Sequence, residues 1–180
     1  MTSAAEVPSL VLPCRAYKIK IWRSWLAIST KLKLYNTCIL PIFLYGLDCW
    51  AISKTDAHKI DALDQWCLHM LLGSKWYQFV RNDDVRRLTN QPKLTAIIQL
   101  RQLTLFGHIM RMDDNADAKR ILLASPLADW RRQLDRPRIT WLSTVQQDVK
   151  QHHLSLPEAT DLAQNRPLWS MMSTYGATQS

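Results

Sequence analysis

Over long stretches of this 180-residue chain, apolar residues recur every three or four positions, the spacing of one face of an α-helix. The clearest stretch opens at Pro92 and continues toward Met110. The chain holds only four glycines, which argues against an all-β fold with many tight turns. Its hydrophobic content of 47% is enough for a packed core. The sequence therefore predicts a mainly α fold, a bundle of roughly six to seven helices with no sizeable sheet.

Capping residues and helix breakers set the expected bounds of these helices. We expect helices over residues 30–46, 54–72, 83–88, 92–110, 119–124, 137–152 and from 155 onward. The helix over 54–72 has the clearest limits, because Ser53 or Thr55 can cap its start and Gly73 follows its end. Its expected apolar face consists of Ile60, Leu63, Cys67, Met70 and Leu71. Pro41 should bend the first helix.

Two further helix starts carry capping residues. The triplet at 82–84, Asn-Asp-Asp, fits the cap and first turn of a short helix. Ser155 and Glu158 fit a capping box at the start of the final helix. Pro167 should then bend or end that helix, because proline lacks the backbone N–H that a helix interior needs.

The chain is strongly basic, with 23 lysines and arginines against 15 acidic residues and a formal charge of +8. Such an excess commonly accompanies nucleic-acid binding, because released counterions drive association with phosphates. Two clusters place basic residues near tryptophans that can stack on bases, Trp22 and Trp25 in the first, Trp130 and Trp141 in the second. The predicted nucleic-acid contacts are Arg15, Lys18, Lys20, Arg23, Lys31 and Lys33 in the first cluster, Arg131, Arg132, Arg136 and Arg138 in the second, and also Arg111.

A structural role is the alternative for these aromatic and basic residues. Tryptophans can anchor a core while arginines form its solvated rim. We expect the core role for Trp50, Trp66 and Trp141. For the arginines of the second cluster, phosphate contact and a solvated rim both stay open.

No arrangement of residues predicts a catalytic centre. Asp113 and Asp114 resemble part of the Tyr/Phe-x-Asp-Asp hairpin of polymerases, yet Arg111 takes the aromatic position and the flanks are not apolar strands. A solvated turn suits these acids, with Asp117 and Lys119, better than a nuclease site. We expect no enzymatic activity from the chain by itself.

Metal and cofactor sites are not expected either. Cys67 and His69 lie two apart on a predicted helix, so they point to different faces. The neighbours His152 and His153 are poorly placed to chelate within one helix, and zinc is therefore not predicted. No phosphate-binding or dinucleotide-binding glycine motif is present, and no cofactor is predicted.

The cysteines and the apolar stretches suggest an intracellular protein. Four cysteines show no CxxC pair, and residues 1–12 lack the basic and apolar regions of a signal peptide. The longest apolar stretch, 38–52, contains Pro41, Gly46 and Asp48 and is shorter than the roughly 20 residues that a membrane span needs. We expect a protein of the nucleus or cytoplasm, neither secreted nor inserted into a membrane.

Four sequence strings carry a family resemblance. They are KLKLYNTCILPIFLYGLDCW at 31–50, FGHIMRM at 106–112, RPRITW at 136–141 and LAQNRPLW at 162–169. In this order they resemble the C-terminal end of the polyprotein of non-LTR (LINE-type) retrotransposons, downstream of the polymerase palm. The matching residues are Lys31, Tyr35, Pro41, Tyr45, Gly46, Trp50, Phe106, Gly107, His108, Arg111, Met112, Arg136, Pro137, Trp141 and Trp169.

The chain departs from the family pattern at four positions. Asp48 stands for the usual Glu, Asp135 for Gly, Asn165 for Asp and Ser170 for the closing Arg. The departures at Asp135 and Ser170 lower the positive charge where phosphate contact would be expected.

The resemblance implies the thumb and post-thumb segment of an endonuclease–reverse transcriptase, without the palm and the endonuclease. It implies a thumb-like helical region at 15–125, a basic connector with a C-terminal helical pair at 126–180, and a loose or unrelated leader at 1–14. The implied partner is RNA or an RNA–DNA or DNA duplex. The alternative is a decayed transposon remnant without selected function, or a fragment that only interacts, whose exposed apolar faces lead to self-association.

Overall fold

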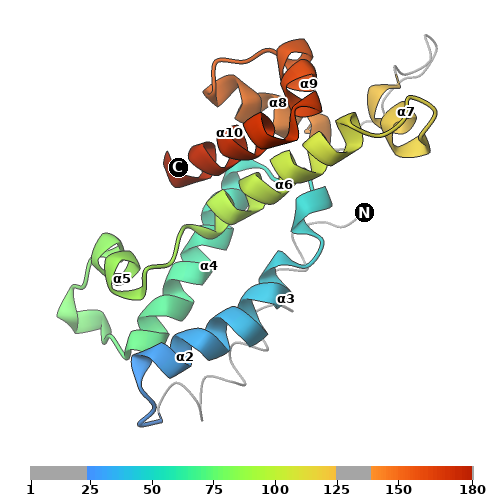
Figure 1. The fold of residues 1–180 in the computed structure, drawn as a ribbon. Helices are drawn as coiled ribbons and strands as arrows, with labels where there is room; N and C mark the ends of the chain where they lie inside the picture. Colours follow the sequence, from blue (N-terminus) through green and yellow to red (C-terminus); the bar gives the residue numbers. More distant parts are fainter. Residues whose placement is uncertain (1–23, 125–138, 180) are drawn as a thin grey trace, which may run out of the picture. The chain divides into compact units, whose positions relative to one another are not determined.

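The computed structural model describes residues 24–124 and 139–179, which are mainly helical and hold no strand (Figure 1). The helices are α2 (Ile28–Leu34), α3 (Leu40–Leu44), α4 (Lys54–Leu72), α5 (Asn82–Thr89), α6 (Leu94–Met110), α7 (Asp117–Leu123), α8 (Trp141–Gln151), α9 (Leu156–Gln164) and α10 (Arg166–Gln179). If the continuous stretch from α2 to α3 counts as one helix, the described residues hold eight helices. The predicted mainly α fold without a sheet is confirmed for these residues. None of their helices has the length and apolar character to cross a membrane.

Helix α4 begins and ends where its sequence signals place it. The Ser53 hydroxyl accepts a hydrogen bond from the backbone N–H of Asp56 (3.1 Å), so Ser53 caps the first turn. Gly73 follows the last turn with φ +71°, a left-handed conformation that glycine adopts without strain. The predicted apolar face was only partly right. The buried face comprises Asp64, Gln65, Cys67, Leu68 and Leu71, whereas Ile60, Leu63 and Met70 are half-buried.

The first helix is interrupted ahead of its proline. A π-helical turn, Tyr35–Ile39, separates α2 from α3, and Pro41 stands in the first turn of α3. Proline cannot donate the backbone hydrogen bond of a regular helix. The π-helix is rare and appears mostly as single turns of this kind within α-helices. The irregularity expected at Pro41 is therefore present, spread over the preceding turn.

Helices α6 and α8 begin two and four residues later than the sequence predicts. Helix α6 begins at Leu94 rather than Pro92, because the Pro92 carbonyl accepts a hydrogen bond from the Arg86 side chain (2.7 Å). Helix α8 begins at Trp141, where Thr140 caps it by accepting from the Ser143 N–H (3.2 Å).

The predicted final helix is two helices. Its capping box is confirmed, because the Ser155 N–H donates to the Glu158 carboxylate (2.7 Å). This hydrogen bond lowers the pKa of Glu158 below its usual value. Helix α9 ends at Gln164, and Pro167 stands in the first turn of α10, where a missing N–H costs nothing.

The chain divides into two compact units. Among the described residues, unit 1 comprises 24–47 and 58–94, and unit 2 comprises 48–57, 95–124 and 139–179. Helix α6 shares a core with α8, α9 and α10. That core consists of Leu103, Phe106, Met110, Val145, Val149, Ala159, Ala163 and Trp169. The predicted boundary between 125 and 126 lies outside the described residues and stays a prediction. The predicted leader at 1–14 lies outside the described residues.

Candidate nucleic-acid interface

The second and fourth sequence motifs meet inside unit 2. A Cβ atom placed on Gly107 would overlap the indole ring of Trp169. Trp169 is almost fully buried, and its Nε1 donates to the carbonyl of Leu103 (2.8 Å). Its ring centroid lies 5.6 Å from that of Phe106. The glycine of one motif thus makes room for the tryptophan of the other, which is a packing role.

Two further hydrogen bonds join the same motifs where their helices end. The Arg111 guanidinium donates to the carbonyl of Ala163 (2.8 Å), near the end of α9. The Gln164 amide donates to the carbonyl of Met110 (3.0 Å), at the end of α6. Carbonyls in the last turn of a helix have no hydrogen-bond donor within the helix, and the Arg111 and Gln164 side chains provide the missing donors. Arg111, predicted as a nucleic-acid contact, is half-buried and engaged in the fold.

The end of the first motif and the third motif also meet within unit 2. The Trp141 indole N–H donates to the carbonyl of Asp48 (2.7 Å), and the Gln102 amide donates to the carbonyl of Trp50 (2.9 Å). The Trp50 side chain is 48% exposed, so the core position expected for it is wrong. Trp66 and Trp141 are half-buried.

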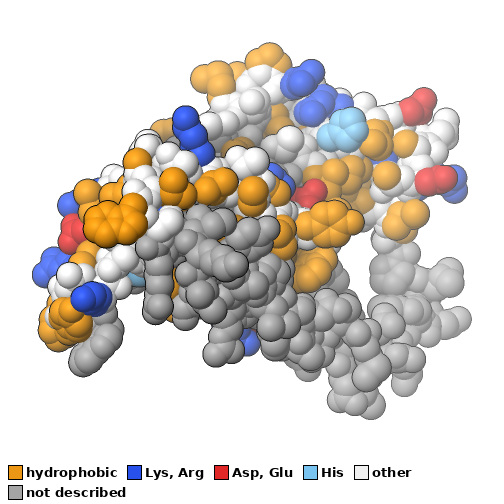
Figure 2. Space-filling model, turned by 90° about the horizontal axis from the view of Figure 1, so that it is seen from below, with side chains coloured by type: hydrophobic (Ala, Val, Ile, Leu, Met, Phe, Trp, Pro, Cys, Tyr) orange, Lys and Arg blue, Asp and Glu red, His pale blue; other side chains and the backbone are white. Residues whose placement is uncertain are grey.

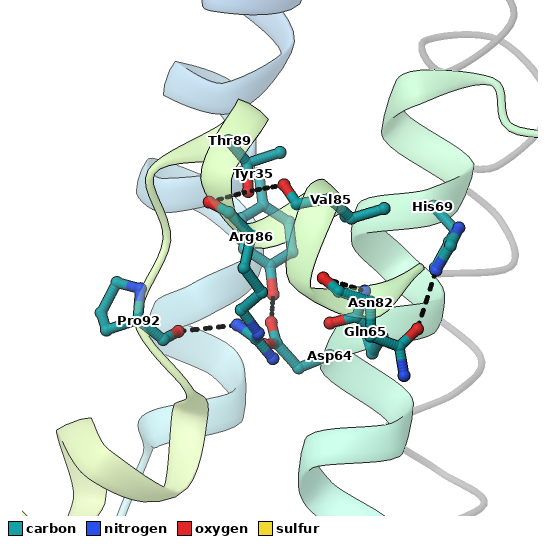
Figure 3. Close-up of polar contacts among 9 residues, drawn as sticks. All are labelled: Tyr35, Asp64, Gln65, His69, Asn82, Val85, Arg86, Thr89 and Pro92. Carbon is teal, nitrogen blue, oxygen red and sulfur yellow. Dashed lines mark hydrogen bonds and ion pairs between the residues drawn. The ribbon is translucent and has the colours of Figure 1, made fainter. Parts of the chain in front are cut away.

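A buried polar network supports unit 1 (Figure 3). The hydroxyl of Tyr35, a residue of the first motif, donates to Asp64. Arg86 forms an ion pair with Asp64 at 2.7 Å, and the Asp64 side chain is only 3% exposed. Burial raises the pKa of Asp64 above its ordinary value, although Tyr35 and Arg86 both favour the charged carboxylate. The three side chains face one another, so they join helices rather than present a reactive group.

Three of the eleven predicted nucleic-acid contacts lie among the described residues. Besides Arg111 these are Lys31 and Lys33, both on α2. Lys31 is 8% exposed and Lys33 is exposed, so Lys33 is the better placed of the two to reach a phosphate. The other eight lie outside the described residues, namely Arg15, Lys18, Lys20, Arg23, Arg131, Arg132, Arg136 and Arg138.

The acidic turn after α6 is held by its own residues. Asp113 accepts a hydrogen bond from the backbone N–H of Asn115 (3.1 Å), and Asp114 pairs with Lys119 (2.6 Å). The Lys119 ammonium lowers the pKa of Asp114 below its usual value. Within the described residues, no group of three or more His, Cys, Asp or Glu side chains is placed to hold a metal ion.

A cavity of about 230 Å³ with a mixed polar and apolar lining lies within unit 2, formed by residues of 52–57, α6 and α8. Its walls include Gln99, Gln147, Asp148 and Gln151. Burial raises the pKa of Asp148 to about 6. This volume is below the roughly 300 to 1,000 Å³ of typical small-molecule sites. We therefore assign no ligand to it.

The sequence prediction missed a surface loop between α4 and α5. Residues 75–81, KWYQFVR, hold three aromatic residues between Lys75 and Arg81, and Tyr77 and Phe79 are exposed. The Lys75 ammonium lies over the Tyr77 ring, 5.6 Å from its centroid. Figure 2 shows hydrophobic and basic side chains together where this loop and α5 lie, at the left edge of the view. The aromatic residues between two cations were visible in the sequence, but the exposure of their side chains was not.

Comparison of the chain with models of known families, with curated proteins and with solved structures finds no match. The family resemblance of the four motifs therefore stays a prediction.

Proposed function

We propose that the chain is the thumb-like tail of a non-LTR retrotransposon reverse transcriptase, which binds nucleic acid without sequence preference and has no catalytic centre of its own. The motif order supports the family. The hydrogen bonds of Arg111, Trp141 and Trp169 support a packing role for the motifs. Because these motif side chains are engaged in packing, we assign binding to other residues of the chain.

The distribution of charge carries the binding proposal. Residues 1–23 and 125–138 together contain eight basic and three acidic residues, a net charge of +5. The remaining residues, almost four times as many, contain fifteen basic and twelve acidic residues, a net charge of +3. Positive charge concentrated in two short stretches raises the local attraction for phosphate.

Salt dependence of binding tests this proposal. A labelled RNA–DNA duplex is titrated with the chain at salt concentrations from about 50 to 200 mM, and the logarithm of the association constant should fall linearly with that of the salt concentration. Replacing Arg131, Arg132, Arg136 and Arg138 by Gln should reduce the slope by roughly one for each arginine that contacts a phosphate.

The matched control removes the same charge from exposed positions of unit 2, by replacing Arg101, Arg120, Lys150 and Arg166 with Gln. It should lower the slope much less. An equal loss in both variants would show that only the total charge matters. Absence of binding at low salt would contradict the proposal outright.

An interaction-only fragment is the second candidate, and α10 supports it. Leu168, Met171 and Tyr175 are exposed and lie three and four positions apart, so they share one face of the helix. Sedimentation of the chain without nucleic acid tests this candidate. Self-association abolished by Met171→Glu, in a chain that binds no duplex, would favour it over the first proposal.

A further inference from the structure

We propose that the loop at 75–81 is a stacking platform, on which unpaired bases of single-stranded nucleic acid stack against Tyr77 and Phe79. This inference rests on the proposed nucleic-acid binding, but it uses a different surface and a different form of the ligand. The basic clusters neutralise phosphates of any strand, whereas this loop recognises bases that are free to leave a duplex.

The exposure of the two aromatic rings is the first support. Phe79 is 87% exposed and Tyr77 is 52% exposed. The two rings lie two positions apart in the sequence, between Lys75 and Arg81. Base–aromatic stacking needs an accessible ring face and tolerates every base, because each base has a π face.

The backbone at Phe79 is the second support. Its φ of 48° and ψ of 36° place it in the left-handed region, which bulky residues rarely adopt. Elsewhere among the described residues, Gly46, Gly73, Asn90 and His153 have a positive φ, and all three residue types tolerate it better than phenylalanine does. Strained conformations of this kind concentrate at ligand-contacting sites. A phenylalanine that gains no burial from its position therefore points to a role outside the fold.

Charge identifies the ligand class. Lys75 and Arg81 are exposed at the two ends of the loop. The nearest acidic residues in sequence are Asp83 and Asp84 on α5, and Asp84 lies 3.8 Å from Arg87. Cations on both sides of exposed rings fit a polyanion with flat groups, in which phosphates meet the cations and bases meet the rings.

The loop is held at both ends, so little ordering is needed on binding. At its start the Ser74 N–H donates to the carbonyl of His69 (3.0 Å). Within it the Lys75 N–H donates to the Gln78 side chain (2.8 Å). At its end Asn82 contacts His69 at 3.1 Å and accepts from Gln65 at 3.3 Å (Figure 3). Such preorganisation lowers the entropy lost when a flexible strand binds.

Comparing a strand with bases and a strand without them tests the inference. An oligothymidine of about twelve nucleotides and an abasic strand of the same length carry the same phosphates. At one low salt concentration, the full-length chain should bind the oligothymidine about tenfold more tightly, the effect of stacking one to two bases. Phe79→Asn should lower this ratio and leave the affinity for the abasic strand unchanged.

Tyr45→Asn is the matched control. Tyr45 is also 87% exposed, but no lysine or arginine lies between Lys33 and Lys54. It should leave the ratio unchanged, and Phe79→Tyr should preserve it. Asparagine suits the left-handed backbone, so Phe79→Asn should keep or raise the melting temperature, which separates a binding loss from unfolding.

The two strands also separate this inference from the proposed function. An affinity ratio of oligothymidine to abasic strand near one in the unaltered chain, or an unchanged ratio in Phe79→Asn, overturns the stacking platform. If the abasic strand still binds, binding by the basic clusters is upheld. Loss of binding to both strands at low salt overturns both proposals.

Discussion

The interiors of the two units are stabilised by different interactions. The core of unit 2 is apolar and is completed by side chains that donate to backbone carbonyls, as Trp169 and Arg111 do. Unit 1 buries an ion pair, Asp64 with Arg86, and adds the Tyr35 hydroxyl. Loss of a partner leaves a void in unit 2 and an unpaired charge in unit 1. Both interiors use residues of the four sequence motifs, Tyr35 in unit 1 and Arg111 and Trp169 in unit 2.

Removing Trp169 should have the largest effect. Trp169→Ala deletes a buried ring and leaves a cavity, so the free energy of unfolding should fall by about 3 to 5 kcal/mol. Trp50→Ala, at the half-exposed tryptophan of the same unit, should cost less than about 1 kcal/mol. Chemical denaturation of both variants measures the difference. Equal losses would remove the distinction between a motif tryptophan that packs and one that does not.

The effects of substitutions at Gly107 and Trp169 should depend on each other. Gly107→Ala should cost about 1 to 3 kcal/mol, because its methyl group needs the space of the Trp169 indole. In the Trp169→Ala background the methyl group enters the void, so the added cost should largely disappear. A double-mutant cycle measures the coupling energy. Additive costs would show that the two motifs do not depend on each other.

In unit 1, removing one charge of the ion pair should cost more stability than removing both charges. Asp64→Ala leaves Arg86 without its partner and should cost about 3 kcal/mol. The double variant Asp64→Leu with Arg86→Met removes both charges and should recover most of that loss. Thermal unfolding at neutral pH compares them. A double variant less stable than Asp64→Ala would contradict a mainly electrostatic cost.

Asp148 is the exception within unit 2, a half-buried carboxylate that lines its cavity. Its folded-state pKa of about 6 exceeds the unfolded value, so the unfolded state loses its proton first as pH rises. Stability should therefore fall between pH of about 4 and 6. Asp148→Asn should gain about 2 kcal/mol at pH 7 and nothing near pH 4. Equal effects at both pH values would show that the charge is not responsible.

The helices were largely predictable because their signals are local. Ser53 and Gly73 mark the limits of α4, and Ser155 with Glu158 marks the start of α9. The buried face of α4 was not predictable in full, since Asp64 is polar and its partner Tyr35 lies 29 residues earlier. Burial of a charge depends on a partner that local periodicity does not reveal.

The candidate sites depended even more on contacts distant in sequence. Arg111 fits a phosphate contact by residue type, yet its guanidinium meets Ala163, 52 residues away. Phe79 reads as an ordinary core residue, and only its left-handed backbone and exposure distinguish it. In the structure, the predicted contact Arg111 forms a hydrogen bond within the fold. The loop at 75–81 is a surface that the sequence prediction omitted.

We propose that the motifs stabilise the fold and that the two basic segments bind the nucleic acid. The most direct test is the salt dependence of duplex binding in a variant with all eight outlying basic residues replaced by Gln. These are Arg15, Lys18, Lys20, Arg23, Arg131, Arg132, Arg136 and Arg138. The account predicts an unchanged melting temperature and a nearly flat dependence on salt. A slope as steep as that of the unaltered chain would contradict it.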